Sequence, residues 1–412
     1  MATYRDAVCP FCGLGCDDLT VEEDAGRLAV RSTDCPVARE RFGHTPPAEP
    51  PRVGGHAATL DDAVRAAAEI LQTSRAPLVA GLGTDVAGAR AALALAERVG
   101  AVVDHERSEG LYRNLAVFQR SGWIATTFAE LRNRCDLLLV VGPDPAALHP
   151  RFYERWVMPP PAFQAPALRE VVFLCGEPLE TTRAALGEVP FTVIPGDAAQ
   201  IGAVAAALST ALTEPAGAAP EIAGLAERLR AAHYAVVAWT ASGFPGAHAD
   251  LAVERLVRLV QDVNRLTRCA GLPLSGYDNV IGANQVCTWQ LGVPLRTSLA
   301  GGAPRHDPHR FAWERFQQTA DAVLWISAFR PEVPAFPPGK AVVALAQPGT
   351  AFAAEPAVVI PVGTPGIDHA AHVFRGDSIV ALRTGRLIDR GLPDVAAVLT
   401  AVAAALPQEA SC

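Results

Sequence analysis

The chain has 412 residues, of which half are hydrophobic and 19% are charged, so a disordered or fibrous protein is excluded and two or three domains are expected. The formal net charge is −8 and no basic run is visible, which excludes the positive surface that a nucleic-acid partner needs. Lys340 is the only lysine, so a P-loop would have to use it. The first glycine of that motif would then fall at position 334, which is Pro334, and this excludes nucleotide hydrolysis by a P-loop.

The first residues lack the charged and apolar segments of a signal peptide. The longest apolar stretches, residues 201–212 and 395–406, are too short to cross a bilayer and are interpreted as buried helices. We therefore expect a cytoplasmic protein without a membrane partner.

Residues 1–52 are predicted to form a small cysteine-rich β unit. Residues 18–32 have the pattern of a β-hairpin, and the proline-rich segment 45–55 is a plausible boundary. A helix is expected next, because Thr59 is a good N-cap and the apolar residues that follow it share one face.

From there the chain alternates short apolar runs with helical segments. The expected strands are residues 78–82, 101–104, 137–142, 171–175, 191–195, 235–240, 322–328, 342–346 and 358–362. The expected helices are residues 86–99, 198–212, 220–231 and 247–266. This alternation is typical of parallel sheets covered on both faces, so we predict Rossmann-like α/β domains at residues 53–218 and 219–412, unless their sheets interleave.

Two segments of the chain echo each other. Residues 77–104 and 235–260 both contain an apolar strand, a glycine-bearing loop and a helix, and such loops hold the ligands of α/β proteins. The first loop, GLGTD at residues 81–85, has only two of the three glycines of a dinucleotide fingerprint, because Val86 takes the third place. A tight turn from strand to helix is the favoured interpretation, and dinucleotide binding is the alternative.

Four cysteines form the strongest motif, with the spacing C-x2-C-x3-C-x18-C. Cys9, Cys12 and Cys16 lie within eight residues, and the predicted hairpin would return Cys35 to them. Four thiolates suit a [4Fe–4S] cluster or a structural zinc ion. The cluster is favoured, because zinc sites usually have two C-x2-C pairs. The alternative is a vestigial site whose thiols only pack.

The other cysteines and the histidines give weaker signals. Cys135, Cys175, Cys269 and Cys287 adjoin apolar runs and are interpreted as buried hydrophobic residues. The histidine pairs His306/His309 and His369/His372 could each share a helix face, and His149 follows a predicted strand; for all of these, structural or surface roles are favoured over ligation. The sequence shows no catalytic residue set.

Several segments together resemble the B subunit of formylmethanofuran dehydrogenase, a molybdenum- or tungsten-pterin oxidoreductase. They are CPFCGLGCDDL at residues 9–19, VVGPDPAALHPRFYERW at 140–156, PLSGYDNVIGANQVCTWQLGVP at 273–294 and VVIPVGTPGIDHAAHVFRGDSIVALR at 358–383. The resemblance implies the molybdopterin oxidoreductase fold, with an iron–sulfur site at Cys9, Cys12, Cys16 and Cys35.

Two departures from that family bear on activity. The family has a metal-ligating cysteine followed by a histidine just after its second strand, whereas residues 102–122 contain no cysteine, and Ser108, Glu109 or Gly110 takes its neighbourhood. A serine oxygen ligates molybdenum in related enzymes, so Ser108 stays a candidate ligand. The family also has a substrate-binding arginine where Ser275 precedes Gly276. Both losses argue against redox catalysis and against a bound pterin metal.

This pattern resembles the B subunit of the formyltransferase/hydrolase complexes of methylotrophic bacteria. The resemblance implies a non-catalytic subunit of a complex that converts formyl-tetrahydromethanopterin to formate through a methanofuran analogue. The implied partners are a zinc-dependent amidohydrolase-like subunit, a β-helical subunit and a formyltransferase, together with the methanofuran-type carrier. The alternative is an active pterin- and iron–sulfur-dependent oxidoreductase.

Overall fold

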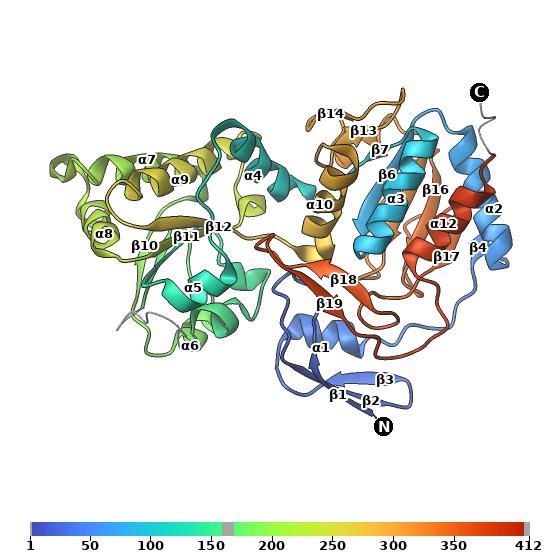
Figure 1. Ribbon diagram of the computed structural model, residues 1–412, viewed down its shortest axis with the longest axis horizontal. Helices are drawn as coiled ribbons and strands as arrows, with labels where there is room; N and C mark the ends of the chain where they lie inside the picture. The colour runs from blue at the N-terminus through green and yellow to red at the C-terminus, as the bar shows by residue number, and fades with distance from the viewer. Residues whose placement is uncertain (1, 159–168, 408–412) are drawn as a thin grey trace. The chain divides into compact units, whose positions relative to one another are not determined.

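The computed structural model describes residues 2–158 and 169–407 (Figure 1). The chain divides into two compact units: unit 1 comprises Met1–Ser108 and Gly276–Cys412, and unit 2 comprises Glu109–Ser275. Unit 2 is therefore an insertion between two halves of unit 1. Among the described residues, no helix has both the length and the apolar character needed to span a bilayer.

This division differs from the predicted domains. The predicted boundary between residues 218 and 219 falls inside unit 2, where strands from both sides of it share one sheet. Residues 1–52 group with unit 1, and β4 (Arg52–Val53) pairs with β17 (Val358–Pro361) of its large sheet. The sheets do not interleave: the sheet of unit 2 uses consecutive strands within residues 137–273, whereas the large sheet of unit 1 joins strands from before and after the insertion.

Unit 1 contains a nine-stranded sheet with the order β14-β13-β7-β6-β15-β16-β17-β4-β5. Its strands besides β4 and β17 are β5 (His56–Ala57), β6 (Pro77–Gly83), β7 (Val102–Val103), β13 (Thr297–Ser298), β14 (Arg305–His306), β15 (Ala322–Ser327) and β16 (Ala341–Ala346). The five strands from β7 to β17 are parallel to one another, and the short strands at both edges are antiparallel.

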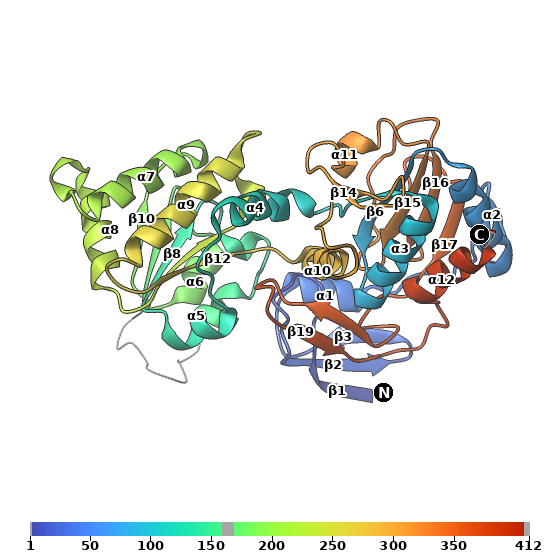
Figure 2. The same cartoon turned by 45° about the horizontal axis from the view of Figure 1, so that its top comes forward.

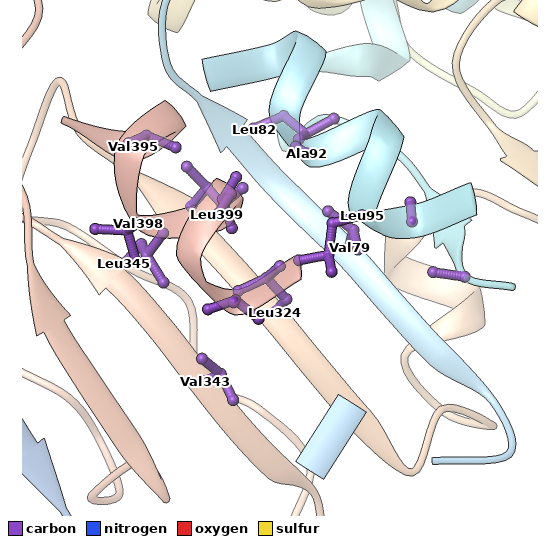
Figure 3. Close-up of a cluster of buried hydrophobic side chains, with 14 of the residues drawn as sticks. Val79, Leu82, Ala92, Leu95, Leu324, Val343, Leu345, Val395, Val398 and Leu399 are labelled. Carbon is purple, nitrogen blue, oxygen red and sulfur yellow. The ribbon is translucent and has the colours of Figure 1, made fainter. Parts of the chain in front are cut away.

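The central strands are buried on both faces because nearly every residue in them is apolar. Alternate side chains point to opposite faces. One set, which includes Val79, Leu324 and Leu345, packs under the helices in the cluster that Figure 3 shows. The other set, which includes Val323 and Trp325, packs against loop aromatic residues on the far face.

The helices of unit 1 cover the first of these faces. They are α2 (Leu60–Thr73), α3 (Val86–Val99), α10 (Val280–Leu291) and α12 (Val395–Ala405), and the short α11 (Trp313–Phe316) lies on the other face. Thr59 caps α2 as predicted, because its side chain accepts a hydrogen bond from the Asp62 amide. The stretch predicted to be a buried helix near the C-terminus is α12.

The N-terminal segment of unit 1 forms a separate antiparallel sheet. Its strands are β1 (Ala2–Ala7), β2 (Leu19–Asp24) and β3 (Arg27–Val30), followed by α1 (Pro36–Gly43). The predicted hairpin is therefore confirmed as β2 and β3. A second hairpin, β18 (Ala371–Phe374) with β19 (Ala381–Thr384), was not predicted.

Unit 2 is built on a five-stranded parallel sheet with the order β10-β9-β8-β11-β12. Its strands are β8 (Leu137–Val141), β9 (Glu170–Leu174), β10 (Phe191–Ile194), β11 (Ala235–Trp239) and β12 (Cys269–Pro273). Its helices are α5 (Phe128–Arg134), α6 (Glu180–Leu186), α7 (Ile201–Ala211), α8 (Pro220–Ala231) and α9 (Ala249–Val263), with α4 (Ser108–Ser121) starting at the boundary. Figures 1 and 2 show α7, α8 and α9 on one face of this sheet and α5 and α6 on the other.

Short 3-10 or π turns complete the chain. They are η1 (Pro145–Ala147), η2 (Tyr153–Val157), η3 (Ala198–Gln200), η4 (Pro215–Gly217), η5 (Ala241–Gly243) and η6 (Tyr277–Asn279).

The two echoing segments occupy equivalent places in the two sheets. In unit 1 the strand order reverses between β6 and β15, and in unit 2 it reverses between β8 and β11. The two similar segments are β6 with α3 in unit 1 and β11 with α9 in unit 2. Each therefore starts with a strand next to the point where the strand order reverses. The loops that follow such strands are where doubly wound folds bind ligands.

Candidate functional site

The structure gathers the thiols of Cys9, Cys12, Cys16 and Cys35 in the interior of unit 1. Each of these residues is less than a tenth exposed. The backbone amide of Cys9 donates to the carbonyl of Cys16 across 2.8 Å, which closes the loop. Burial raises the pKa of the Cys9 thiol well above its usual value, and the nearby Cys12, Cys16 and Cys35 raise it further. All four cysteines are therefore buried in unit 1.

The fourth cysteine reaches this place through the β2–β3 hairpin. Val21 pairs with Val30, and the chain then turns so that Cys35 becomes the N-cap of α1. Pro36 starts the helix, because its fixed φ and missing amide hydrogen suit the first turn.

Cysteine thiolates are suitable ligands for a metal, but the four side chains are not arranged as a metal-binding site in this structure. Among residues 2–158 and 169–407, no group of three or more histidine, cysteine or acidic side chains is arranged to hold a metal ion. The four-cysteine metal site therefore stays a prediction, in which these residues would hold an iron–sulfur cluster or zinc.

Backbone contacts fix the cysteine loop against the second half of unit 1. A Cβ atom added to Gly13 would lie 2.7 Å from the Cα of Gly276, so both positions require glycine. The Gly13 carbonyl accepts a hydrogen bond of 2.7 Å from Gly376, in the turn of the β18–β19 hairpin. The Phe11 carbonyl accepts one of 3.3 Å from Asp278. The loop thus rests directly on residues 276–278.

Asp278 links the cysteine loop to a second group of polar residues, at the strand-order reversal of unit 1. Asp278 and Asn279 both have positive φ, which aspartate and asparagine tolerate better than most residues. The side-chain Nδ2 of Asn279 donates to the Thr84 backbone carbonyl (2.9 Å), and its Oδ1 accepts from the Phe374 backbone amide (2.8 Å). Its side chain therefore joins the end of β6 to β18.

The Asp278 carboxylate is held by buried positive charge. Nε of Arg330 donates to its Oδ2 across 2.7 Å, and the same guanidinium also pairs with Glu106. The Arg107 guanidinium lies 4.0 Å from this carboxylate. Because Asp278 and Arg330 are both almost fully buried, their pairing offsets a large desolvation cost.

His105, just after β7, is a buried neutral histidine. Its Nδ1 accepts from the Arg107 amide at 2.9 Å, so Nε2 carries the proton and donates to the Asp278 carbonyl at 3.0 Å. Burial lowers the pKa of His105 to about 4. The ring thereby holds the strained backbone of Asp278 in place.

Asp104 and Ser108 belong to a neighbouring ion pair rather than to an open site. The Ser108 hydroxyl accepts hydrogen bonds from Arg296 at 3.2 and 3.1 Å, and the same guanidinium lies 3.6 Å from Asp104. The Trp313 amide donates to the Asp104 carboxylate. Burial raises the pKa of Asp104 to about 7, although Arg296 opposes the shift. We call the buried residues Asp104, His105, Ser108, Asp278, Arg296 and Arg330, with Glu106 and Arg107, the ionic network.

The other predicted candidates belong to neither the cysteine loop nor the ionic network. His149 is buried in unit 2, and Ser275 is the last residue of that unit. The two histidine pairs share no helix: His306 ends β14 and His309 follows it, whereas His369 precedes β18 and His372 lies on it. The GLGTD loop forms the expected tight turn, since Asp85 caps α3. Cys135, Cys175, Cys269 and Cys287 are buried, and Cys412 lies outside the described residues.

Sequence reasoning missed most of the ionic network. Asp104 ends a predicted strand and His105 directly follows it, so their position could have identified them. Arg296 and Arg330 lie in loops without a recognisable motif, and only the fold brings them to the strand ends.

The sequence and the fold were compared with those of known proteins. No family model matches the sequence. The B subunit of the formyltransferase/hydrolase complex Fhc of Methylorubrum extorquens is 33% identical over 319 residues, which are 76% of this chain and 85% of that protein. The B subunit of the tungsten-containing formylmethanofuran dehydrogenase 2 of Methanocaldococcus jannaschii is 28% identical over 322 residues, 74% of each chain.

A solved structure also matches the fold. It is the formyltransferase/hydrolase complex (FhcABCD) from Methylorubrum extorquens in complex with methylofuran, with a TM-score of 0.74 and 29% identity. The match covers 85% of this chain and 97% of the chain in that structure.

Fold and sequence together define an α/β protein related to the B subunits of one-carbon enzyme complexes. Within that class, the chain belongs to the family of the B subunit of the formyltransferase/hydrolase complex. The tungsten-containing dehydrogenase subunits are more distant relatives.

The neutral state of His105 predicts a specific acid sensitivity. A histidine in the unfolded chain has a pKa of about 6.5, and the folded value is about 4, so its contribution is present above pH 6.5 and lost as the pH falls toward 4. Chemical denaturation at pH 7 and pH 4 should show that His105→Gln removes up to about 3 kcal/mol of the acid-induced loss. The exposed His372→Gln serves as the control. Equal pH dependence in all three proteins would contradict a neutral His105.

Because Asp278 and Arg330 pair in the interior, removing Arg330 should greatly lower the free energy of unfolding, and removing the Asp278 charge as well should restore part of it. Replacing Arg330 by Met should lower the free energy of unfolding by about 3–5 kcal/mol, because the Asp278 carboxylate loses its main partner. Adding Asp278→Asn should restore at least about 1 kcal/mol of this loss, because the unpaired charge is removed. Arg31→Met, at the exposed pair with Glu22, should cost less than about 1 kcal/mol. Additive losses in the double variant would show that the pair is not coupled.

Proposed function

We propose that this chain is a non-catalytic subunit of a one-carbon formyltransferase/hydrolase complex. The observation that carries the proposal is the match to the B subunit of such a complex, in sequence over 85% of that relative and in fold over 97% of the solved chain. The complex would convert formyl-tetrahydromethanopterin to formate through a methanofuran analogue. A zinc-dependent amidohydrolase-like subunit, a β-helical subunit and a formyltransferase would be its partners.

The ionic network supports a structural role for this chain. At the strand-order reversal of unit 1, where doubly wound folds bind ligands, Asp278 and Asn279 bond to the ends of β6 and β7. Ser108, the candidate metal ligand, is bonded to Arg296. The polar groups at this edge thus satisfy one another.

The competing function is an active pterin- and iron–sulfur-dependent oxidoreductase. The relatives named as tungsten-containing dehydrogenase subunits, at 28% and 25% identity, are the observation that favours it. In that case Ser108 would be the metal ligand, and its bonds to Arg296 would have to open.

The proposal predicts that Ser108 is dispensable for the activity of the assembled complex. The chain should be co-expressed with its partner subunits, and the complex isolated through a tag on this chain. Ser108→Ala should keep formyl-tetrahydromethanopterin hydrolysis within about twofold of the wild type, because the reacting groups would lie in other subunits. A hundredfold loss in a correctly assembled complex, or failure of the chain to assemble with its partners, would contradict the proposal.

We further propose that Cys9, Cys12, Cys16 and Cys35 hold a [4Fe–4S] cluster, with structural zinc as the alternative. Their spacing in the sequence and their shared burial in unit 1 support this assignment. Bound there, a cluster would join the N-terminal sheet to the rest of unit 1. Such a cluster would be held by thiolates alone and would need no pterin.

The cluster proposal predicts the metal content of the natively purified complex. Iron should be present at about four atoms per chain, with absorbance near roughly 400 nm that is lost when any of the four cysteines is changed to Ser. The buried Cys175→Ser should retain both signals. One zinc per chain would favour the structural zinc site over the cluster. If neither iron nor zinc is found, the four thiols only pack in the interior. Molybdenum or tungsten at about one per chain would instead support the oxidoreductase.

A further inference from the structure

Trp289, near the end of α10, is a large apolar side chain on the surface of unit 1. It is 61% exposed, although an indole ring is usually well buried in a soluble protein. Its ring packs against that of Phe374 in β18, the strand beside α10, with the ring centres 5.6 Å apart (Figure 1). Phe374 is almost fully buried, and its backbone amide is held by Asn279. The exposed indole therefore rests on a fixed partner.

The β18–β19 hairpin carries polar and positively charged side chains on the same face as Phe374. Its register pairs Phe374 with Ala381 and His372 with Arg383. Residues directly opposite in a hairpin share a face, and so do alternate residues along a strand, so these four side chains lie on one side. His372, Ala381 and Arg383 are exposed. The other side of the hairpin, with Leu382, faces the cysteine loop.

The positive charge on this exposed face has no partner within the chain. In residues 2–158 and 169–407, the side chains of Arg383 and His372 make no hydrogen bond or ion pair, whereas Arg375, in the same hairpin, pairs with Asp377. The chain carries a formal net charge of −8, so an acidic partner is repelled by the molecule on average and attracted to an unpaired arginine. We call this surface the hairpin patch; it comprises Trp289, His372, Phe374, Ala381 and Arg383.

We propose that the hairpin patch is a docking surface for an acidic segment of a partner subunit. Tryptophan and arginine are among the residue types that contribute most to binding at protein interfaces, and Trp289 and Arg383 supply one of each. The partner would cover the indole and so remove apolar surface from water, while one of its carboxylates pairs with the Arg383 guanidinium. Docking here presupposes the proposed function, in which this chain is part of a complex.

The geometry of the patch favours a protein partner over a small ligand. Small ligands bind in concave pockets, whereas a side chain as exposed as Trp289 projects from the surface. Because the indole already packs on Phe374, little of its conformational freedom is left to lose on binding. Projecting, preordered aromatic side chains of this kind serve as anchors in the pockets of a partner protein.

The test measures how tightly the complex holds this chain. The chain is co-expressed with its partner subunits, the complex is purified through a tag on this chain, and its dissociation on dilution is followed by mass photometry. Trp289→Ala should raise the dissociation constant by about tenfold or more, because an anchoring side chain is lost. Arg383→Glu should also raise it by about tenfold or more, because the attraction to the acidic segment becomes repulsion. Added salt should weaken the wild type more than Arg383→Gln, since salt screens the charge pair.

Matched variants in unit 2 separate docking from a general effect on the surface. Leu266→Ala and Arg268→Glu change an exposed apolar side chain and an exposed arginine outside the patch. Both should keep the dissociation constant within about twofold of the wild type, because most surface positions contribute little to binding. Arg383→Glu and Arg383→Gln alter only an exposed side chain, so they test the patch even if Trp289→Ala disturbs α10.

A photo-crosslinker identifies what covers the patch. With p-benzoylphenylalanine placed at position 289 of the assembled complex, a cross-link to a segment of a partner subunit rich in aspartate or glutamate is expected. Cross-links confined to this chain or to its copies, or made to a segment without acidic residues, would overturn docking of an acidic partner. Unchanged dissociation in both Trp289→Ala and Arg383→Glu, in a wild-type complex that does assemble, would refute the patch alone. Failure of the wild-type chain to assemble with its partners would contradict the proposed function and the patch together.

Discussion

The turn at Asp278 and Asn279 is the point on which the organisation of unit 1 depends. Its left-handed backbone lets the Asp278 amide bond the cysteine loop while the Asp278 carbonyl faces His105. The side chains of the same two residues reach Arg330 on one side and the ends of β6 and β18 on the other. Segments that are far apart in sequence are thus joined through two residues, and their strained conformation is held by the bonds they make.

The same turn explains why the carboxyl edge of the unit 1 sheet is bonded internally. In doubly wound folds the strand-order reversal leaves a crevice for a ligand. Here the ionic network brings three arginines, Arg107, Arg296 and Arg330, to three carboxylates, Asp104, Glu106 and Asp278. His105 is neutral and adds no positive charge to this network.

The alternation of strands and helices could be predicted from the sequence, because it depends on local patterns. The apolar run at β6, the caps of α2 and α3, and the β2–β3 hairpin all follow from residues close together in the chain. The division into units could not be predicted this way. Residues 109–275 are an insertion, and pairings such as that of β15 with β6 show that the chain returns to the first sheet.

The candidate site also has a part that could be predicted from local sequence and a part that could not. The four cysteines are close in sequence, so their spacing made them visible, although spacing alone does not say which metal, if any, they bind. The ionic network could not be predicted from the sequence, because Arg296 and Arg330 belong to loops. Their partners Ser108 and Asp278 lie about 190 and 50 residues away in the chain.

The energetics of the ionic network bear on how the fold is used. A ligand entering the carboxyl edge of this sheet would have to separate Arg330 from Asp278 and Arg296 from Ser108, each in the protein interior. Leaving one buried charge without its partner costs about 3–5 kcal/mol, so the ligand would need to supply matching charges and hydrogen bonds at the same places. A subunit whose role is assembly faces no such requirement. It gains a rigid sheet edge from the network, and the cysteine loop, anchored to the same turn, ties the N-terminal sheet to that edge.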